Sequence, residues 1–198
     1  YEYQAEYFSS PENQDQIDLI HNNIELVKAV YNMEAEGIHI SEEYCNSAIE
    51  EHEKNLADIT EDIERLTQQK YKAGSKWLKG VLSDQGIELE VSDKGNVILD
   101  KNALKSIPNA VASLVLEMRD QEKHATFYST FLRFKDSNGI LHPSYRLTGT
   151  DTGRFSCSDP NLQQVPKEEK AIEEGHTVRG AFYVEDDFFL VSMDYDQM

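Results

Sequence analysis

The chain has 198 residues, a formal net charge of −18 and two cysteines, and these values exclude several classes of protein. Its longest apolar runs are only a few residues, far short of the roughly 20 that a membrane-spanning helix needs. Cys45 and Cys157 lack the close Cys or Cys/His spacing of a zinc site, so we interpret them as ordinary thiols of a reducing compartment. The sequence has no signal peptide, and its missing initiator methionine together with its abrupt ending favours a piece of a longer protein.

The charge is distributed unevenly along the chain. Residues 1–66 carry 3 basic and 17 acidic side chains, residues 67–154 carry 13 and 10, and residues 155–198 carry 3 and 10. Because phosphate binding relies on lysine and arginine, the middle segment is the part suited to nucleic acid.

An aromatic, acidic tail over residues 1–12 precedes a predicted helix. Ser10-Pro11 is typical of a helix start, since proline in the first turn loses no hydrogen bond. Gly37 is expected to end the helix. One apolar stripe lies along this helix at steps of three and four residues, at Ile17, Ile20, Ile24, Val27 and Tyr31.

Two long helices are predicted next, the first of them capped by Ser41. The seam of the first keeps a heptad rhythm, at Cys45, Ile49, His52, Leu56, Ile59, Ile63 and Leu66. The second repeats the spacing with polar Gln121 interrupting it, at Val111, Leu114, Met118, Ala125, Tyr128 and Leu132. We expect the two to pack antiparallel, with residues 70–104 as the far tip, where a short helix starts at Ser75.

From about residue 136 the sequence changes to turns and short strands. DSNG at 136–139 is a turn, residues 142–156 indicate extended pieces, and residues 159–166 form a loop bounded by two prolines. The final apolar run, residues 188–193, predicts a strand buried on both faces. The expected fold class is therefore α+β, predominantly α, with long antiparallel helices followed by an incomplete domain of short β-strands.

Two acidic and polar features could carry chemistry. Asp194 follows the final apolar run, and a carboxylate at the end of a rigid strand can hold a divalent cation, although a solvated strand end is the simpler interpretation. In the loop over 148–166, Arg154 and the amides of Asn161, Gln163 and Gln164 can read minor-groove acceptors that all base pairs share. The alternative is a loop whose polar groups fix its own turns.

The cations of the middle segment form a third feature. Arg119 and Lys123 are four residues apart on one helix face. Lysines also gather around the helix start at Ser75, at Lys70, Lys72, Lys76 and Lys79. These groups are either a phosphate-binding surface or an ordinary solvated helix surface.

Three motifs occur in order: TGRFSCSDPNLQQVP at 152–166, VRGAF at 178–182 and LVSMDYDQM at 190–198. Their order and spacing closely resemble the family A DNA polymerases, relatives of bacterial DNA polymerase I, and GTDTGRFS is similar to the bacteriophage members. Upstream, VYNMEAEGIHIS resembles the family's helix before the thumb, GSKWLKGVL its thumb tip, and LEMRDQEKHATFY its second long thumb helix.

The resemblance implies a division of the chain and an activity. Residues 13–40 would be a palm-proximal helix, 41–135 the thumb and 136–198 the first part of the palm, with 1–12 as the end of an upstream exonuclease-like domain. The complete enzyme would be a DNA-directed DNA polymerase with two Mg²⁺ ions, in the cytoplasm of a bacterial or phage-infected cell. Its partners would be primer-template DNA, deoxynucleoside triphosphates, and the remaining palm and fingers in the same or a separate chain.

The resemblance also implies residue roles. Asp194 matches the first of two catalytic aspartates that bind the magnesium ions, and the backbone carbonyl of Tyr195 a further ligand. Tyr195, Asp196, Gln197 and Met198 match the nucleotide pocket. Arg154 matches the arginine that contacts the primer end. The other residues that match DNA contacts are Asn161, Gln164, Arg179, Arg119, Lys123 and Lys76.

Some positions depart from the family pattern. Asp196 stands in place of the usual Ser, Ala125 in place of a common Lys, and Gln164 in place of a frequent Asn. The second catalytic Asp and the fingers helix do not occur in the sequence, so we expect the chain alone to lack polymerase activity. Two other interpretations remain at this point: an acidic helical module that binds a partner helix through its heptad seam, and a relative of the single-subunit RNA polymerases.

Overall fold

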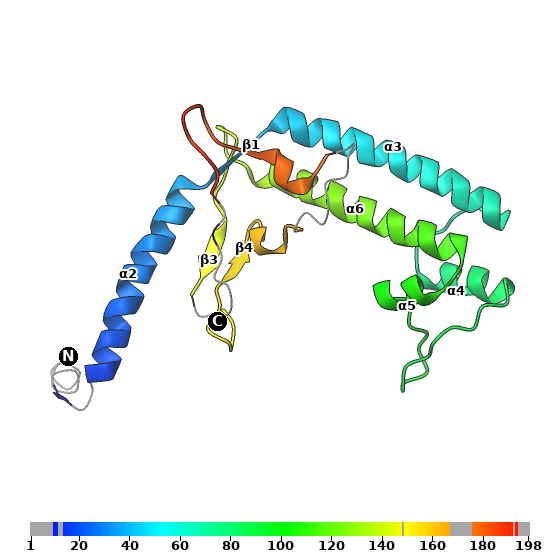
Figure 1. Cartoon of the computed structure of the whole chain (residues 1–198), viewed down its shortest axis with the longest axis horizontal. Helices are drawn as coiled ribbons and strands as arrows, with labels where there is room; N and C mark the ends of the chain where they lie inside the picture. The colour runs from blue at the N-terminus through cyan, green and yellow to red at the C-terminus, as the bar shows by residue number, and fades with distance from the viewer. Residues whose placement is uncertain (1–9, 12–13, 148, 167–175, 192, 194–198) are drawn as a thin grey trace. The chain divides into compact units, whose positions relative to one another are not determined.

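The computed structural model describes residues 10–11, 14–147, 149–166, 176–191 and 193, with the backbone alone for 14–23. The chain divides into two compact units. Unit 1 contains Tyr1–Glu42, Thr130–Ala171 and Arg179–Met198. Unit 2 contains Glu43–Ser129 and Ile172–Val178. Figure 1 shows the elements of both units.

Unit 2 is built on two long antiparallel helices, α3 (Glu42–Thr67) and α6 (Ala110–Phe134), which lie side by side in Figure 1. Their facing side chains form one buried cluster, in which Ile59 and Ile63 of α3 meet residues of α6. The members contributed by α6 are Val111, Ala112, Val115 and Met118. The predicted fold class and the pairing of the long helices are confirmed.

A polar residue in the seam of α3 contacts the polar residue that interrupts the stripe of α6. His52 is buried in α3, and its Nδ1 donates to Oε1 of Gln121, the residue that interrupts the stripe of α6. The His52 ring also stacks on Tyr128, with 5.6 Å between ring centroids. Because α6 covers most of the α3 seam, the seam is not an exposed surface for a partner helix. This packing argues against the interpretation of the chain as an interaction module.

Two shorter helices complete the core of unit 2: α4 (Ser75–Asp84) and α5 (Lys101–Ser106). They bury Leu78, Val81, Leu82 and Leu104 in the same cluster. Asp100 caps α5 by accepting from the amides of Asn102 and Ala103. The helix start at Ser75 is as predicted.

Unit 1 contains a small antiparallel sheet in the order β2-β1-β5, made of β2 (Ile140–Leu141), β1 (Ile38–Ile40) and β5 (Phe182–Tyr183). Helix α2 (Gln14–Glu36) leads into β1 through Gly37, whose φ of 66° is left-handed. A side chain at Gly37 would collide with the carbonyl of Leu141 and with Ile140. Glycine therefore allows the close approach of the helix end to β2, and it ends α2 as predicted.

A second hairpin in unit 1 pairs β3 (Ser144–Arg146) with β4 (Ser156–Ser158). Two short 3₁₀ helices follow, η2 (Leu162–Gln164) and η3 (Val178–Ala181). The DSNG turn is present as predicted, with Asp136 accepting from the amides of Asn138 and Ile140 at 2.8 and 2.9 Å.

The predicted apolar stripe of α2 is only partly correct. The helix forms, but Tyr31 is 68% exposed, Ile24 and Val27 are also exposed, and Val30 is the buried residue. Ile17 and Ile20 lie where the structure describes the backbone alone. A stripe is buried only where another element covers it, and the described residues place none over this one.

The predicted buried strand at residues 188–193 is wrong over the residues that the structure describes. Phe188, Phe189, Leu190, Val191 and Met193 are between 59% and 89% exposed, and no strand is present from 184 to 191. A buried strand needs neighbouring strands for its backbone and apolar cover on both faces. Within the described part of the chain, the pairing ends with β5 at Phe182–Tyr183.

Two residues of the α3 seam provide a test of the unit 2 core. Ile63 is fully buried, whereas Leu66, the next predicted seam position, is 48% exposed. Ile63→Ala should lower the free energy of unfolding by about 2–5 kcal/mol, because it leaves a cavity. Leu66→Ala is the matched control and should cost about 1 kcal/mol or less. Equal losses in denaturant titrations would contradict this packing.

Candidate nucleic-acid interface

The β3–β4 hairpin of unit 1 presents Arg154 to solvent. Its connection is closed by two hydrogen bonds, from the Gly153 amide to the Thr150 carbonyl at 3.2 Å and from the Thr150 hydroxyl to the Arg154 carbonyl at 2.7 Å. Gly153 has a φ of 73°, which favours glycine. The backbone of Arg154 is thus held within the turn while its side chain is exposed.

The polar side chains of the DPNLQQ loop have divided roles. Asn161 caps η2 by accepting from the amide of Gln163 at 3.1 Å, and Gln163 Nε2 donates to the carbonyl of Phe155 at 3.1 Å. Gln164 is exposed. The interpretation that this loop fixes its own turns is therefore correct for Asn161 and Gln163, while the Asn161 amide nitrogen and the Gln164 amide remain as groups that could contact a ligand.

Arg179 lies in η3 and is also exposed. Its Nε donates to the carbonyl of Pro166, the last residue of the loop, at 3.0 Å. This bond uses one of the five guanidinium N–H groups, so the terminal nitrogens keep their donors. Arg179 is thereby connected to the same loop that carries Asn161 and Gln164.

Three predicted DNA-binding cations lie in unit 2. Arg119 and Lys123 are exposed and one turn apart on α6, and Arg119 Nη1 donates to the carbonyl of Leu99 at 2.7 Å. Lys76 is exposed in the first turn of α4. The structure therefore divides the predicted DNA-binding residues, with Arg154, Asn161, Gln164 and Arg179 in unit 1 and these three in unit 2.

The five predicted DNA-binding cations are among the exposed cations of the described residues that have no carboxylate partner. Lys28, Arg65, Lys101 and Lys135 form ion pairs with Glu25, Asp62, Asp120 and Glu42. Within the described residues, no ion pair involves any of the five predicted DNA-binding cations, which are Arg154, Arg179, Arg119, Lys123 and Lys76.

Two residues of α3 in unit 2, Tyr44 and Glu51, make contacts that were not predicted from the sequence. The Tyr44 hydroxyl accepts from the Thr177 amide at 2.8 Å and donates to the Thr177 carbonyl at 3.1 Å. His176 Nδ1 and the Glu51 carboxylate form a hydrogen bond, which lowers the pKa of Glu51 although burial opposes the shift. No local pattern signals these contacts, because the partners are 125 to 133 residues apart.

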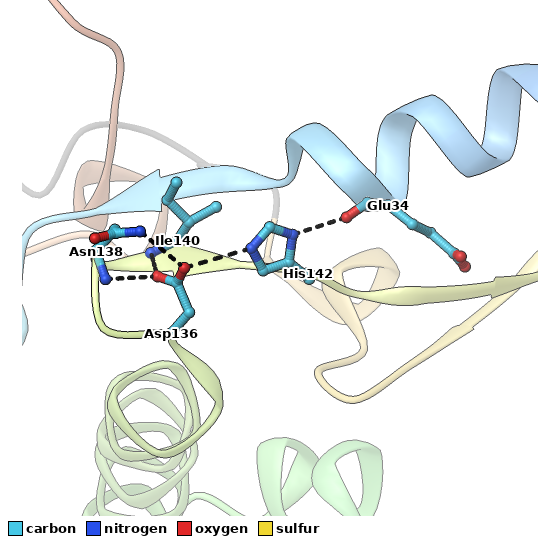
Figure 2. Close-up of polar contacts among 5 residues, drawn as sticks. All are labelled: Glu34, Asp136, Asn138, Ile140 and His142. Carbon is cyan, nitrogen blue, oxygen red and sulfur yellow. Dashed lines mark hydrogen bonds and ion pairs between the residues drawn. The ribbon is translucent and has the colours of Figure 1, made fainter.

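A second unforeseen cluster lies in unit 1 and is drawn in Figure 2. His142 contacts the carbonyl of Glu34 through Nδ1 at 2.8 Å, and its Nε2 lies 3.8 Å from the Asp136 carboxylate. Hydrogen bonds from the amides of Ile140 and Asn138, and the nearby His142, lower the pKa of Asp136. This cluster joins the end of α2 to the DSNG turn.

The predicted metal and nucleotide positions lie outside the described residues. These are Asp194, Tyr195, Asp196, Gln197 and Met198. Among the residues that the structure does describe, no group of three or more His, Cys, Asp or Glu side chains could hold a metal ion. The described helices also include none that is long and apolar enough to cross a membrane.

Comparison with known proteins identifies the family to which this chain belongs. The sequence model of DNA polymerase family A matches residues 42–198, so the chain belongs to that family. It is 30% identical over 196 residues to DNA polymerase I of Lactococcus lactis subsp. cremoris and 31% identical over 205 residues to that of Helicobacter pylori. These alignments cover 94% and 98% of this chain but 22% of each relative.

A solved structure agrees with these relatives. The chain resembles the POL domain of Pol1 from M. smegmatis, described as a complex with DNA primer-template and dNTP, with a TM-score of 0.69 and 26% identity. The likeness covers 80% of this chain and 29% of that one. The predicted membership of family A is confirmed.

The cap in the DPNLQQ loop can be tested with two amides of the same motif. Asn161→Ala should lower the free energy of unfolding by about 1 kcal/mol, because the Gln163 amide loses its acceptor. Asn161→Asp keeps an acceptor and should retain most of the stability. Gln164→Ala, at an exposed position, should change stability by about 0.5 kcal/mol at most. Thermal unfolding checks all three, and a costly Asn161→Asp would contradict the capping role.

Proposed function

We propose that the chain grips the primer-template duplex in a template-directed DNA polymerase. The observation that carries this proposal is the set of five exposed cations without ion pairs in the described structure, in a chain with 37 acidic residues. Each lies at a position that matches a DNA contact of the family. Exposed cations that are not neutralised by carboxylates can bind phosphates and release counterions from DNA.

The groups of unit 1 suit a duplex of any sequence. Arg154 offers a forked set of donors, and the amides of Asn161 and Gln164 can donate as well. The minor groove presents acceptors at the same places in every base pair, so such donors can hold a duplex without selecting its sequence. In unit 2, Arg119, Lys123 and Lys76 would contact the DNA backbone as part of a thumb over residues 41–135.

The catalytic part of the proposal concerns the last five residues. Asp194 would be one of two carboxylates that hold two Mg²⁺ ions, with the carbonyl of Tyr195 as a further oxygen ligand. When bound, such ions stabilise the attacking and leaving oxygens of nucleotidyl transfer. The residues from Tyr195 to Met198 would line the site of the incoming deoxynucleoside triphosphate. Residues 136–198 would be the first part of the palm, after a palm-proximal helix over 13–40.

The whole enzyme would be larger than this chain. The chain spans 22% of the length of the curated relatives it matches, so polymerisation would also need the remaining palm and fingers, in the same or a separate chain. Residues 1–12 would be the end of an upstream exonuclease-like domain. The enzyme would act in DNA replication or repair in the cytoplasm of a bacterial or phage-infected cell, and a bacteriophage origin stays a prediction.

Binding of the chain to a primer-template duplex tests the grip. At low salt, Arg154→Ala should weaken binding by about five- to tenfold, because it removes a charged donor. Lys123→Ala should reduce the slope of log affinity against log salt by about 1. Arg65→Ala is the control, since Arg65 is exposed but already paired with Asp62. An equal loss in Arg65→Ala, or salt-independent binding of the wild type, would contradict the proposal.

Primer extension tests the catalytic part. The 198-residue chain should show no template-dependent, magnesium-dependent synthesis, because one carboxylate cannot hold two ions. A polymerase I treated in parallel provides the positive control. Synthesis by the chain that disappears in Asp194→Asn would show that it holds a complete active site, contrary to the prediction.

A further inference from the structure

The last turn of α2 anchors the strand that begins the β3–β4 hairpin. The Glu34 carboxylate accepts from the amide of Tyr145 in β3 at 2.5 Å. The Glu34 backbone carbonyl accepts from His142 Nδ1 at 2.8 Å, three residues before Tyr145. One residue of α2 thus holds the chain on both sides of the entry into β3, as Figure 2 shows for His142.

The hairpin transmits the position of Tyr145 to Arg154. Tyr145 pairs with Cys157 and Arg146 with Ser156, two residues after Arg154. A side chain at Gly149 would collide with Ser156, so the two arms also approach closely beyond the paired residues. Displacement of β3 at Tyr145 therefore moves the arm that carries Arg154.

His142 connects this anchor to a second carboxylate. Because the Glu34 carbonyl can only accept, Nδ1 carries a proton, and Nε2 faces the Asp136 carboxylate at 3.8 Å. A neutral imidazole would turn a lone pair toward that carboxylate, whereas an imidazolium satisfies both acceptors. The side chains of His142 and Asp136 are 39% and 34% exposed, so solvent moderates the attraction.

We propose that Glu34 is a positioning residue for Arg154. The inference rests on the proposed function, since it assumes that Arg154 contacts DNA. The groups that face His142 are Asp136 from the turn and Glu34 from α2, and beyond Glu34 lies Tyr145, whose ring neighbours Cys157.

Hydrogen exchange at the Tyr145 amide tests the anchor without DNA. Glu34→Ala should accelerate exchange at Tyr145 by about three- to tenfold, and Glu34→Gln, which keeps an acceptor, should restore most of the protection. Glu36→Ala is the matched control, because Glu36 is an exposed acid in the same turn of α2. Unchanged exchange in Glu34→Ala would overturn the anchor.

A double-mutant cycle tests whether the anchor acts through Arg154. Glu34→Ala should weaken binding to primer-template DNA about three- to tenfold in the wild-type background and less than about twofold in Arg154→Ala. Equal losses in both backgrounds would overturn the positioning role while the wild type still binds. Absence of wild-type binding would instead reject the proposed function, and the inference with it.

Discussion

The strand β1 is the constraint on which unit 1 depends. Its three residues pair on one side with β2 and on the other with β5, which are about a hundred and about a hundred and forty residues away in sequence. Backbone bonds from Ile40 to Gly139 and from Ser41 to Ala181 extend the same ladder. Gly37 makes this arrangement compatible with α2, because any side chain there would meet the carbonyl of Leu141.

The loop over residues 148–166 was interpreted either as a DNA contact or as a loop that fixes its own turns, and these two interpretations are compatible. The side-chain oxygen of Asn161 and the side-chain nitrogen of Gln163 form hydrogen bonds within the loop itself. The turn before the loop holds the backbone of Arg154 and leaves its guanidinium in solvent. A loop that fixes its own shape in this way loses less conformational entropy when its remaining donors contact a ligand. The hydrogen bonds within this loop therefore support its role in binding.

The features that were predicted correctly from the sequence are those that local residue patterns determine. The helical periodicity of α3 and α6, the start of α4 at Ser75 and the DSNG turn each depend on neighbouring residues. Burial was predicted incorrectly for the described side chains of α2 and of residues 188–193, because burial depends on what covers a face and apolar composition does not contain that information. The contacts of Glu34 with His142 and Tyr145 join residues more than a hundred positions apart, so no motif could reveal them.

The polar pair in the seam of unit 2 also determines how the two long helices align. A heptad seam of similar apolar residues can slide by seven residues and still bury its side chains. Such a shift would separate the His52 ring from Gln121 and leave its Nδ1–H without an acceptor, at a cost of about 1–3 kcal/mol for a newly unsatisfied buried polar group. His52 and Gln121 therefore specify one register of the two helices. This register also fixes the position along α3 at which Arg119 and Lys123 of α6 lie.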